Sequence, residues 1–237
     1  MDKIMIVSVH QPQYLPWLGY FAKILESDCF VFLDTVQYKT REFQNRNKIR
    51  TGKGWIWLTV PVKTKGCAGQ SIGDVLIDND CDWHQEHKKS LQVWYARSRF
   101  FKEYFPFFQD AYERKWERLI DLNIHIINYI LRELDITTPV YRESDIGTSK
   151  KSTERIIELC RKLKADTYLS GIGGRDYLDE DAFKDAGIVL KYQQFRHPEY
   201  LQLHTDEARA FEAYMSIVDL LFNEGPGSRE ILRQGGQ

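Results

Sequence analysis

The chain has 237 residues, of which 43% are hydrophobic and 28% charged, and its formal net charge is −1. This length allows one sizeable core, and the composition is that of an ordinary globular protein. Such a charge gives no reason to expect a nucleic-acid polymer or an anionic membrane as a partner, although it leaves room for a local basic pocket. The N-terminal apolar run is too short for a signal peptide, and no segment approaches the roughly 18 apolar residues of a membrane span. We therefore expect a cytoplasmic protein, whose oligomeric state the sequence does not reveal.

The first part of the chain alternates strand and helix patterns. Residues 4–9 predict a buried parallel strand, residues 18–26 a helix and residues 29–38 a second strand. Together they predict a βαβ unit with a right-handed crossover. Two further strands are predicted at residues 55–62 and 75–78.

The middle of the chain, residues 83–134, has the apolar spacing of helices. Pro106 is expected to break or kink the first of them. His84 and His87 are three residues apart, but no acidic or thiol partner completes a metal site, so we expect a solvated helix start. Four cysteines without CxxC spacing are expected to be buried thiols.

The last part returns to α/β patterns. A helix is predicted from about Ser152, capped by Ser152 or Thr153, and strands are predicted in DTYLSG and IVLKYQQF. The whole pattern predicts an α/β fold with a Rossmann-like, mostly parallel sheet, of which a nucleotidyltransferase-like arrangement is one form. We expect a single domain over residues 1–232, with a helical insertion at about 83–135 and a disordered tail at 233–237.

Polar residues follow directly after the first predicted strand: His10, Gln11, Gln13 and Tyr14. Open α/β sheets bind their ligands at the carboxyl ends of their strands, so this stretch is a candidate binding site. The alternative is a rigid structural turn, because two prolines fix the backbone here. Two glutamines and a histidine favour the functional interpretation.

A second cluster begins at Asp34, at the end of the second predicted strand. Its candidate binding residues are Gln37, Tyr38, Lys39, Asn45, Arg46 and Asn47. Its cations suggest an anionic ligand such as a phosphate or a carboxylate, and they are Lys39, Arg41, Arg46, Lys48 and Arg50. A solvated edge is the alternative.

A third cluster lies in YLSGIGGRDYLD, with Ser170, Gly171, Gly173 and Tyr177 as candidates. Its glycines would let backbone N–H groups approach an anion, but the pattern is neither a Walker loop nor a GxGxxG fingerprint. His197 precedes a proline, which holds it extended, and it either faces the site or ends a strand.

Six blocks covering nearly the whole chain resemble the WbqC-like family. They are HQPQYLPWLGYFAKI, SDCFVFLDTVQYKTREFQNRNKI, WLTVPV, YLSGIGGRDYLD, HPEY and SIVDLLFNEG. Members of that family are typically encoded among genes for O-antigen and other surface polysaccharides. The resemblance implies a role in decorating sugars, including the attachment of acyl or amino-acid groups to amino sugars.

The layout is also similar to that of nucleotidyltransferase-type synthetases, such as pantothenate synthetase, which form an acyl-adenylate from ATP. The HxGH spacing of those enzymes is absent, because Gln, Pro and Gln follow His10 and no second histidine lies nearby. We therefore weigh three functions: an amide-forming transferase, an ATP-dependent adenylate-forming ligase, and a non-catalytic protein that binds nucleotide-sugars. An acyl or aminoacyl donor and ATP are the corresponding cofactors.

The leading hypothesis is transfer of an acyl or aminoacyl group, for example glycyl, to the amine of a nucleotide-linked amino sugar. His10 is the candidate base because histidine titrates near neutral pH, and Asp34 would orient it or bind the sugar amine. Gln11, Gln37 or the backbone at 171–174 would stabilise the oxyanion, and Arg46 with Lys39 would hold phosphate. No serine or cysteine has a nucleophile-elbow context, so direct transfer is expected.

Overall fold

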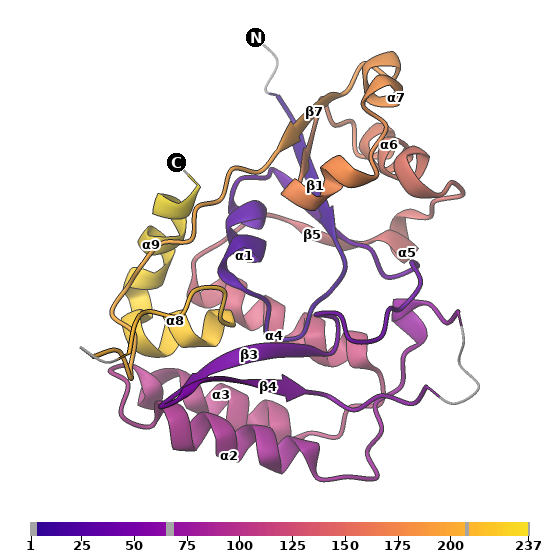
Figure 1. The fold of residues 1–237 in the computed structure, drawn as a ribbon. Coiled ribbons are helices and arrows are strands. Elements are labelled where there is room, and N and C mark those ends of the chain that lie inside the picture. The colour runs from indigo at the N-terminus through magenta and orange to yellow at the C-terminus, as the bar shows by residue number, and fades with distance from the viewer. Residues whose placement is uncertain (1–3, 65–68, 207–208, 237) are drawn as a thin grey trace.

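Five strands form one parallel sheet, which lies in the upper part of the molecule as drawn in Figure 1. The structure is a computed structural model that describes residues 4–64, 69–206 and 209–236. The sheet order is β5-β2-β1-β6-β7, and every neighbouring pair is parallel. The strands are β1 (Ile6–His10), β2 (Cys29–Phe32), β5 (Val140–Arg142), β6 (Thr167–Ser170) and β7 (Val189–Tyr192). The expected Rossmann-like parallel sheet is confirmed.

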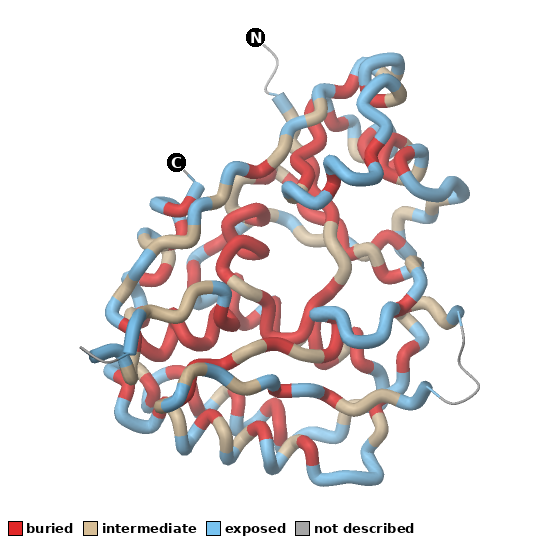
Figure 2. The backbone as a smooth tube through the Cα atoms, viewed as in Figure 1, coloured by how far each residue is buried: buried red, intermediate tan, exposed pale blue. Residues whose placement is uncertain are grey.

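Helices cover both faces of this sheet. They are α1 (Leu18–Leu25), α2 (Trp83–Tyr95), α3 (Phe101–Glu113), α4 (Leu119–Glu133), α5 (Glu143–Ile146), α6 (Ser152–Lys162), α7 (Glu180–Asp185), α8 (Ile217–Glu224) and α9 (Ser228–Gly235), with short 3₁₀ turns η1 (Ile72–Asp74), η2 (Ile172–Asp176) and η3 (Gly225–Gly227). The central strands and α1 are buried almost throughout, as Figure 2 shows.

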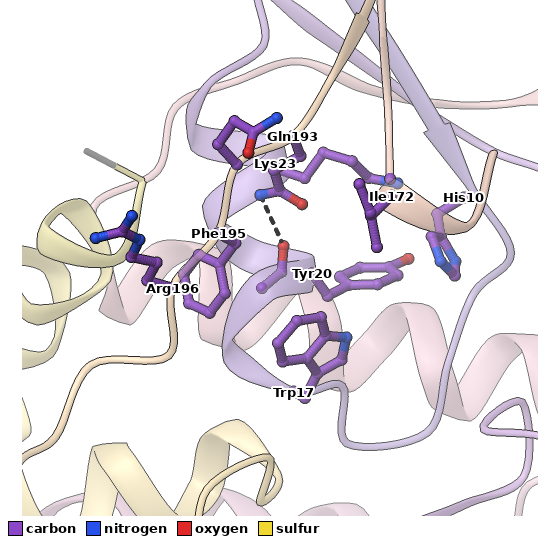
Figure 3. A pocket seen from close by; sticks show the side chains of 11 residues that line it. His10, Trp17, Tyr20, Lys23, Ile172, Gln193, Phe195 and Arg196 are labelled. Atoms are coloured by element: carbon purple, nitrogen blue, oxygen red, sulfur yellow. Dashed lines mark hydrogen bonds between the residues drawn. The ribbon is translucent and has the colours of Figure 1, made fainter. Parts of the chain in front are cut away.

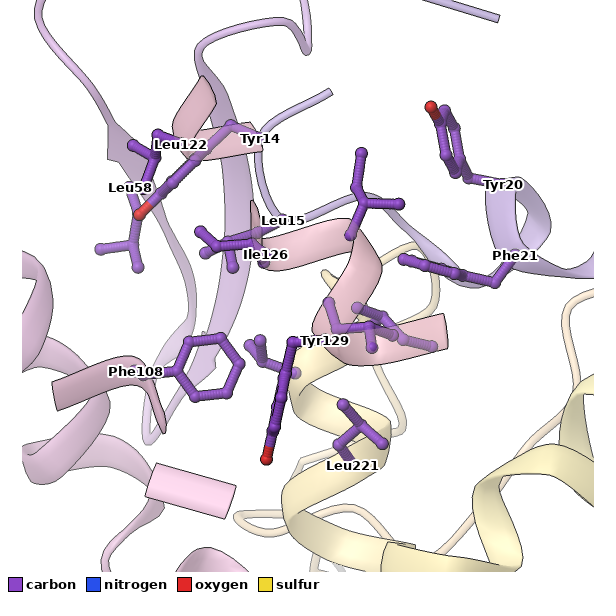
Figure 4. Packing of buried hydrophobic residues seen from close by; sticks show 14 of the residues in the cluster. Tyr14, Leu15, Tyr20, Phe21, Leu58, Phe108, Leu122, Ile126, Tyr129 and Leu221 are labelled. Carbon is purple, nitrogen blue, oxygen red and sulfur yellow. The ribbon is translucent and has the colours of Figure 1, made fainter. Parts of the chain in front are cut away.

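Alternating side chains of β2 divide the core into two clusters. Phe30 and Phe32 face the larger cluster, which contains residues of α1 to α4, α8 and the hairpin of β3 (Arg46–Thr51) and β4 (Gly54–Thr59) (Figure 4). Cys29 and Val31 face the smaller cluster, which contains residues of α6 and α7. This alternation is what a strand covered on both faces requires, and burying each such side chain contributes roughly 1.5–3 kcal/mol. The helices of the predicted insertion therefore share a core with α1.

The basic loop expected after β2 is in fact a strand. β3 (Arg46–Thr51) pairs antiparallel with β4 (Gly54–Thr59) in a separate two-stranded sheet. Arg46 stacks over Trp57 at 4.4 Å and Lys48 over Trp55 at 4.9 Å, while Ile49 on the opposite face is fully buried. Cation–π contacts across the hairpin thus account for Arg46 and Lys48.

The helical middle region divides differently from the expectation. The break lies at 96–100, between α2 and α3, and Pro106 lies within α3. Pro106 and Lys102 are exposed, so water can satisfy the carbonyl that a proline leaves without a donor, while Phe105 and Phe108 anchor the other face. His87 is buried rather than solvated.

Several boundaries also differ from the expectation. β2 ends at Phe32, and residues 75–78 make only isolated bridges. Lys151 is the N-cap of α6 because Ser152 has a φ of 50°, whereas a capping serine needs an extended backbone. α9 runs to Gly235, so the helix includes most of the tail that we expected to be disordered.

The cysteines also depart in part from the expected burial. Cys29 and Cys160 are buried free thiols. Cys81 is exposed, and Cys67 lies outside the described residues.

Candidate functional site

The sheet order places a ligand-binding crevice at the ends of two particular strands. From β1, the next strands along the chain, β2 and then β5, are added on one side of the sheet. The last two strands, β6 and β7, are added on the other side of β1, so the strand order reverses there. In open α/β sheets, ligands bind where the direction of building reverses, outside the carboxyl ends of the strands. Here that point lies between His10, the last residue of β1, and Ser170, the last residue of β6.

Two cavities meet at this point. The first has a volume of about 550 Å³ and lies between α1 and the segment that follows β7. The second has a volume of about 530 Å³ and lies toward the start of α6 and the turn after β6. His10, Lys23 and Gly171 line both cavities. Volumes of this size suit small organic molecules, so two ligands could approach the same three residues.

Aromatic and amide side chains dominate the first cavity (Figure 3). Trp17 and Tyr20 come from the start of α1, and Phe195 and Arg196 come from the segment after β7. Gln193 ties these two segments together, because its Nε2 donates to the carbonyl of Gly19 at 3.2 Å. This cavity therefore offers flat apolar faces beside a few polar groups.

Lys23 is a functional candidate that the sequence interpretation missed. Its side chain is only 3% exposed, and its Nζ donates to the carbonyl oxygen of Val9 at 3.0 Å. Burial lowers the pKa of Lys23 to about 7, and the nearby Glu26 carboxylate opposes that shift. A substantial part of Lys23 is therefore neutral near pH 7 and able to accept a proton. The available signal was a lone lysine among the apolar residues of LGYFAKIL.

His10 is held in one neutral form. Its Nδ1 lies 3.1 Å from the carbonyl oxygen of Gln11, which can only accept, so Nδ1 carries the proton and Nε2 keeps its lone pair. Burial, reinforced by the charge of Lys23, lowers the pKa of His10 to about 3, although the bond to Gln11 opposes the shift. His10 is thus an acceptor of hydrogen bonds and a weak base, unlike the near-neutral base we expected.

A chain of side-chain contacts connects β1 to the segment after β2. Gln11 Oε1 accepts from Gln44 Nε2 at 2.6 Å, and Gln44 Oε1 accepts from the backbone N–H of Lys39 at 3.0 Å. These bonds place Lys39 on the wall of the second cavity, which Gln11 also lines. Gln44 is a positioning residue that the sequence interpretation did not single out.

The third sequence cluster does gather at the site. Ser170, Gly171, Gly173 and Tyr177 all line the second cavity. A side chain placed on Gly173 would meet nothing within 4 Å, so the turn leaves its backbone open to a ligand. The expectation that these residues lie together with His10 agrees with the geometry.

Asp34 does not orient His10. Its carboxylate is 5% exposed and accepts from the backbone N–H of Ser144 at 3.0 Å and from the Ser144 hydroxyl at 2.6 Å. It lines neither cavity. Both carboxylate oxygens are engaged in fixing the start of α5, which is a structural role.

Two residues of the opening stretch point into the protein. Tyr14 is fully buried, and its hydroxyl bonds to His87 Nδ1 at 2.8 Å and to the Tyr112 hydroxyl at 2.6 Å. Gln13 is 8% exposed and lines neither cavity. The structural alternative for this turn therefore holds at Tyr14 and Gln13, while His10 and Gln11 face the cavities.

Most of the second cluster also lies elsewhere. Asn45 and Asn47 are buried and donate to backbone carbonyls, and Arg46 is stacked on Trp57. None of these residues lines either cavity. The hairpin turns them toward its own packing rather than toward the sheet edge.

The remaining candidates divide in the same way. Gln37 and Tyr38 line a separate surface pocket of about 460 Å³, which Lys39 also borders. His197 lies in an aromatic cluster, where its Nδ1 is 2.9 Å from the carbonyl of Pro198 and burial lowers its pKa. Of the five cations expected to meet an anion, Lys39 alone lines either cavity, and it lines the second. Arg50 instead packs 3.3 Å from Glu212.

Comparison with known proteins decides the family. The model of the WbqC-like protein family matches residues 11–231. The chain belongs to the WbqC-like protein family. It is 36% identical over 235 residues to a Mycobacterium tuberculosis (strain ATCC 25618 / H37Rv) protein named "Uncharacterized protein Rv1507c", and the match covers 98% of each chain. No solved structure matches the chain.

The matched region of this WbqC-like chain begins at Gln11, directly after His10, and includes every residue that lines the two cavities except Val9 and His10. Within the described ranges, no three His, Cys, Asp or Glu side chains come together as a metal site. None of the described helices is long and apolar enough to cross a membrane.

Proposed function

We propose that this WbqC-like protein forms an amide, transferring an acyl or aminoacyl group to the amine of a nucleotide-linked amino sugar in surface-polysaccharide biosynthesis. The observation that carries the proposal is the pair of cavities that share His10, Lys23 and Gly171. Group transfer between two organic substrates needs two binding spaces that meet at one point, so that the reacting atoms come within about 3–3.5 Å of each other. Family membership supports the pathway.

The reaction assigns complementary roles to the shared wall. The sugar nitrogen attacks the donor's carbonyl carbon, a C–N bond forms, the bond to the leaving group breaks with its electron pair, and the nitrogen loses a proton. His10 Nε2 accepts a hydrogen bond from the attacking amine and orients it. Lys23 takes the proton, because its pKa of about 7 makes it a far stronger base than His10, whose pKa is about 3.

Product formation tests this proposal. The purified chain is incubated with nucleotide-linked amino sugars and a panel of acyl or aminoacyl thioesters, and the product is analysed by mass spectrometry for the added acyl mass. An amide product that forms without ATP supports transfer. A product that requires ATP and the free acid, with release of pyrophosphate, would instead establish the ligase. Substrate binding without any product would favour the third function, a non-catalytic protein that binds nucleotide-sugars.

A further inference from the structure

We propose that the second cavity is a phosphate subsite, in which Lys39 and Arg155 bind the phosphate groups of the nucleotide-linked substrate. The identity of that substrate rests on the proposed function, whereas the oxyanion chemistry rests on the cavity itself. The first cavity is then left to the acyl donor.

The charges of the second cavity all have one sign. Its charged lining residues are Lys39 and Arg155, Lys23 adds an amine that is only partly protonated near pH 7, and no Asp or Glu is among the described residues that line it. These three basic residues come from α1, from the segment after β2 and from α6, so no single solvated helix face accounts for them. On a chain with a formal net charge of −1, such a gathering is a local feature that suits an anion.

Arg155 is held so that its terminal nitrogens remain available. Its Nε donates to the carbonyl oxygen of Lys150 at 3.2 Å and lies 3.3 Å from Glu143 Oε1. Among the described residues, its two terminal nitrogens have no hydrogen-bond partner. A guanidinium fixed through Nε presents these nitrogens as a fork, and a phosphate can accept from both of them.

A buried carboxylate stands behind that fork. Glu143 is fully buried and accepts hydrogen bonds from the hydroxyls of Thr35 and Thr148. It fixes the position of Arg155 and offsets part of its charge. Arg155 would therefore contribute mainly by the fixed direction of its two terminal nitrogens. Lys39 would contribute a full positive charge, because its side-chain nitrogen has no ion pair among the described residues.

The remaining walls let an anion approach closely. Gly173 leaves open space where a side chain would stand, and Ser152 at the same cavity begins the eleven-residue helix α6. The first turn of a helix carries partial positive charge, which adds to the field of the two cations. The cavity volume of about 530 Å³ accommodates a diphosphate group with part of its sugar.

Titration calorimetry of the full chain with pyrophosphate at low ionic strength tests this subsite. We expect Lys39→Gln and Arg155→Gln each to weaken pyrophosphate binding at least ~10-fold, because each removes a charge-assisted contact. Arg41→Gln and Arg161→Gln are matched controls, since they remove exposed cations that line neither cavity, and they should bind as the unmodified chain does. Malonate distinguishes the source of the anion, and tighter binding of malonate than of pyrophosphate would assign the cavity to a carboxylate.

Arg155→Gln leaves Glu143 buried without its cation, so its melting temperature is measured first. Arg155→Lys keeps the positive charge but loses the two-pronged guanidinium. Lys39→Gln changes an exposed residue, so pyrophosphate binding can still be tested with this variant if the Arg155 variants unfold. Unchanged pyrophosphate binding in folded Lys39 and Arg155 variants, or no binding by the unmodified chain, would overturn the subsite. Amide formation is measured in a separate assay, so a failure of the phosphate subsite does not by itself contradict the proposed amide-forming function, and the reverse also holds.

Discussion

The Nζ of Lys23 lies 3.0 Å from the carbonyl oxygen of Val9, which ties α1 to the end of the strand that precedes it. This bond is the one that the Lys23 side chain makes to the described residues. The amine is therefore both buried and adjacent to the wall shared by the cavities. Burying a cation is costly, so its presence here favours a functional role.

Lys23→Met should lower the rate of amide formation by about 100-fold or more, which is the usual contribution of a general base. In the unmodified chain the rate should rise with pH through about pH 7, as the Lys23 amine loses its proton. Initial rates measured from pH 5.5 to 9 check both points. A substitution that lowers the rate but leaves the same pH inflection would exclude Lys23 as the proton acceptor.

Lys23 should also make the free energy of unfolding depend on pH. Its pKa falls from 10.5 to about 7 on folding, so between these values the unfolded chain binds more protons and stability rises with pH. Below about pH 7 the full cost of burial remains. Relative to Lys23→Met, the unmodified chain should gain about 2 kcal/mol between pH 7 and pH 9. Urea unfolding of both proteins at pH 7 and pH 9 measures this difference. If the difference in unfolding free energy between the two proteins is the same at both pH values, the lowered pKa of Lys23 is wrong.

His10→Ala should reduce turnover by about 100-fold with little change in melting temperature, because the attacking amine loses the acceptor that orients it. Because the pKa of His10 is about 3, the pH dependence above pH 5 should keep its shape in the variant. The same rate measurements give both results. If the inflection near neutral pH disappears with His10, then His10 is the base and the role assigned to Lys23 is wrong.

Asp34→Ala should destabilise the fold by roughly 1–3 kcal/mol, because it removes two hydrogen bonds to Ser144 in a buried place. Ser144→Ala is the matched variant, which removes only the hydroxyl contact and should have a smaller effect. Chemical unfolding gives the stability and an assay at low temperature gives the activity per folded molecule. A strong loss of activity without loss of stability would show that Asp34 takes part in the reaction and that its role is more than structural.

Sequence patterns were sufficient for the parallel sheet and for the edge at which the cavities open. The uncharged run before His10 predicts a buried strand, and the polar residues after it mark the strand's carboxyl end. Gly171 and Gly173 were placed correctly for the same reason, because they follow β6. These inferences depend on local periodicity, which one strand or helix expresses by itself.

The rest depends on contacts between distant segments. In the sequence, Arg46 fits a solvated or ligand-binding loop, because nothing local shows that its guanidinium stacks on Trp57 of the other strand. Tyr14 was misassigned because its partners, His87 and Tyr112, are 73 and 98 residues away. Lys23 was overlooked because a single charge on an apolar helix is ordinary unless the helix is known to be buried on every side.

The shared wall of His10, Lys23 and Gly171 has a kinetic consequence. If the two substrates occupy adjoining spaces and meet there, both must be bound before either reacts, and no product leaves before the second substrate has bound. Steady-state rates measured at varied concentrations of both substrates should then give intersecting double-reciprocal lines. Parallel lines would mean that the donor leaves its group on the protein first.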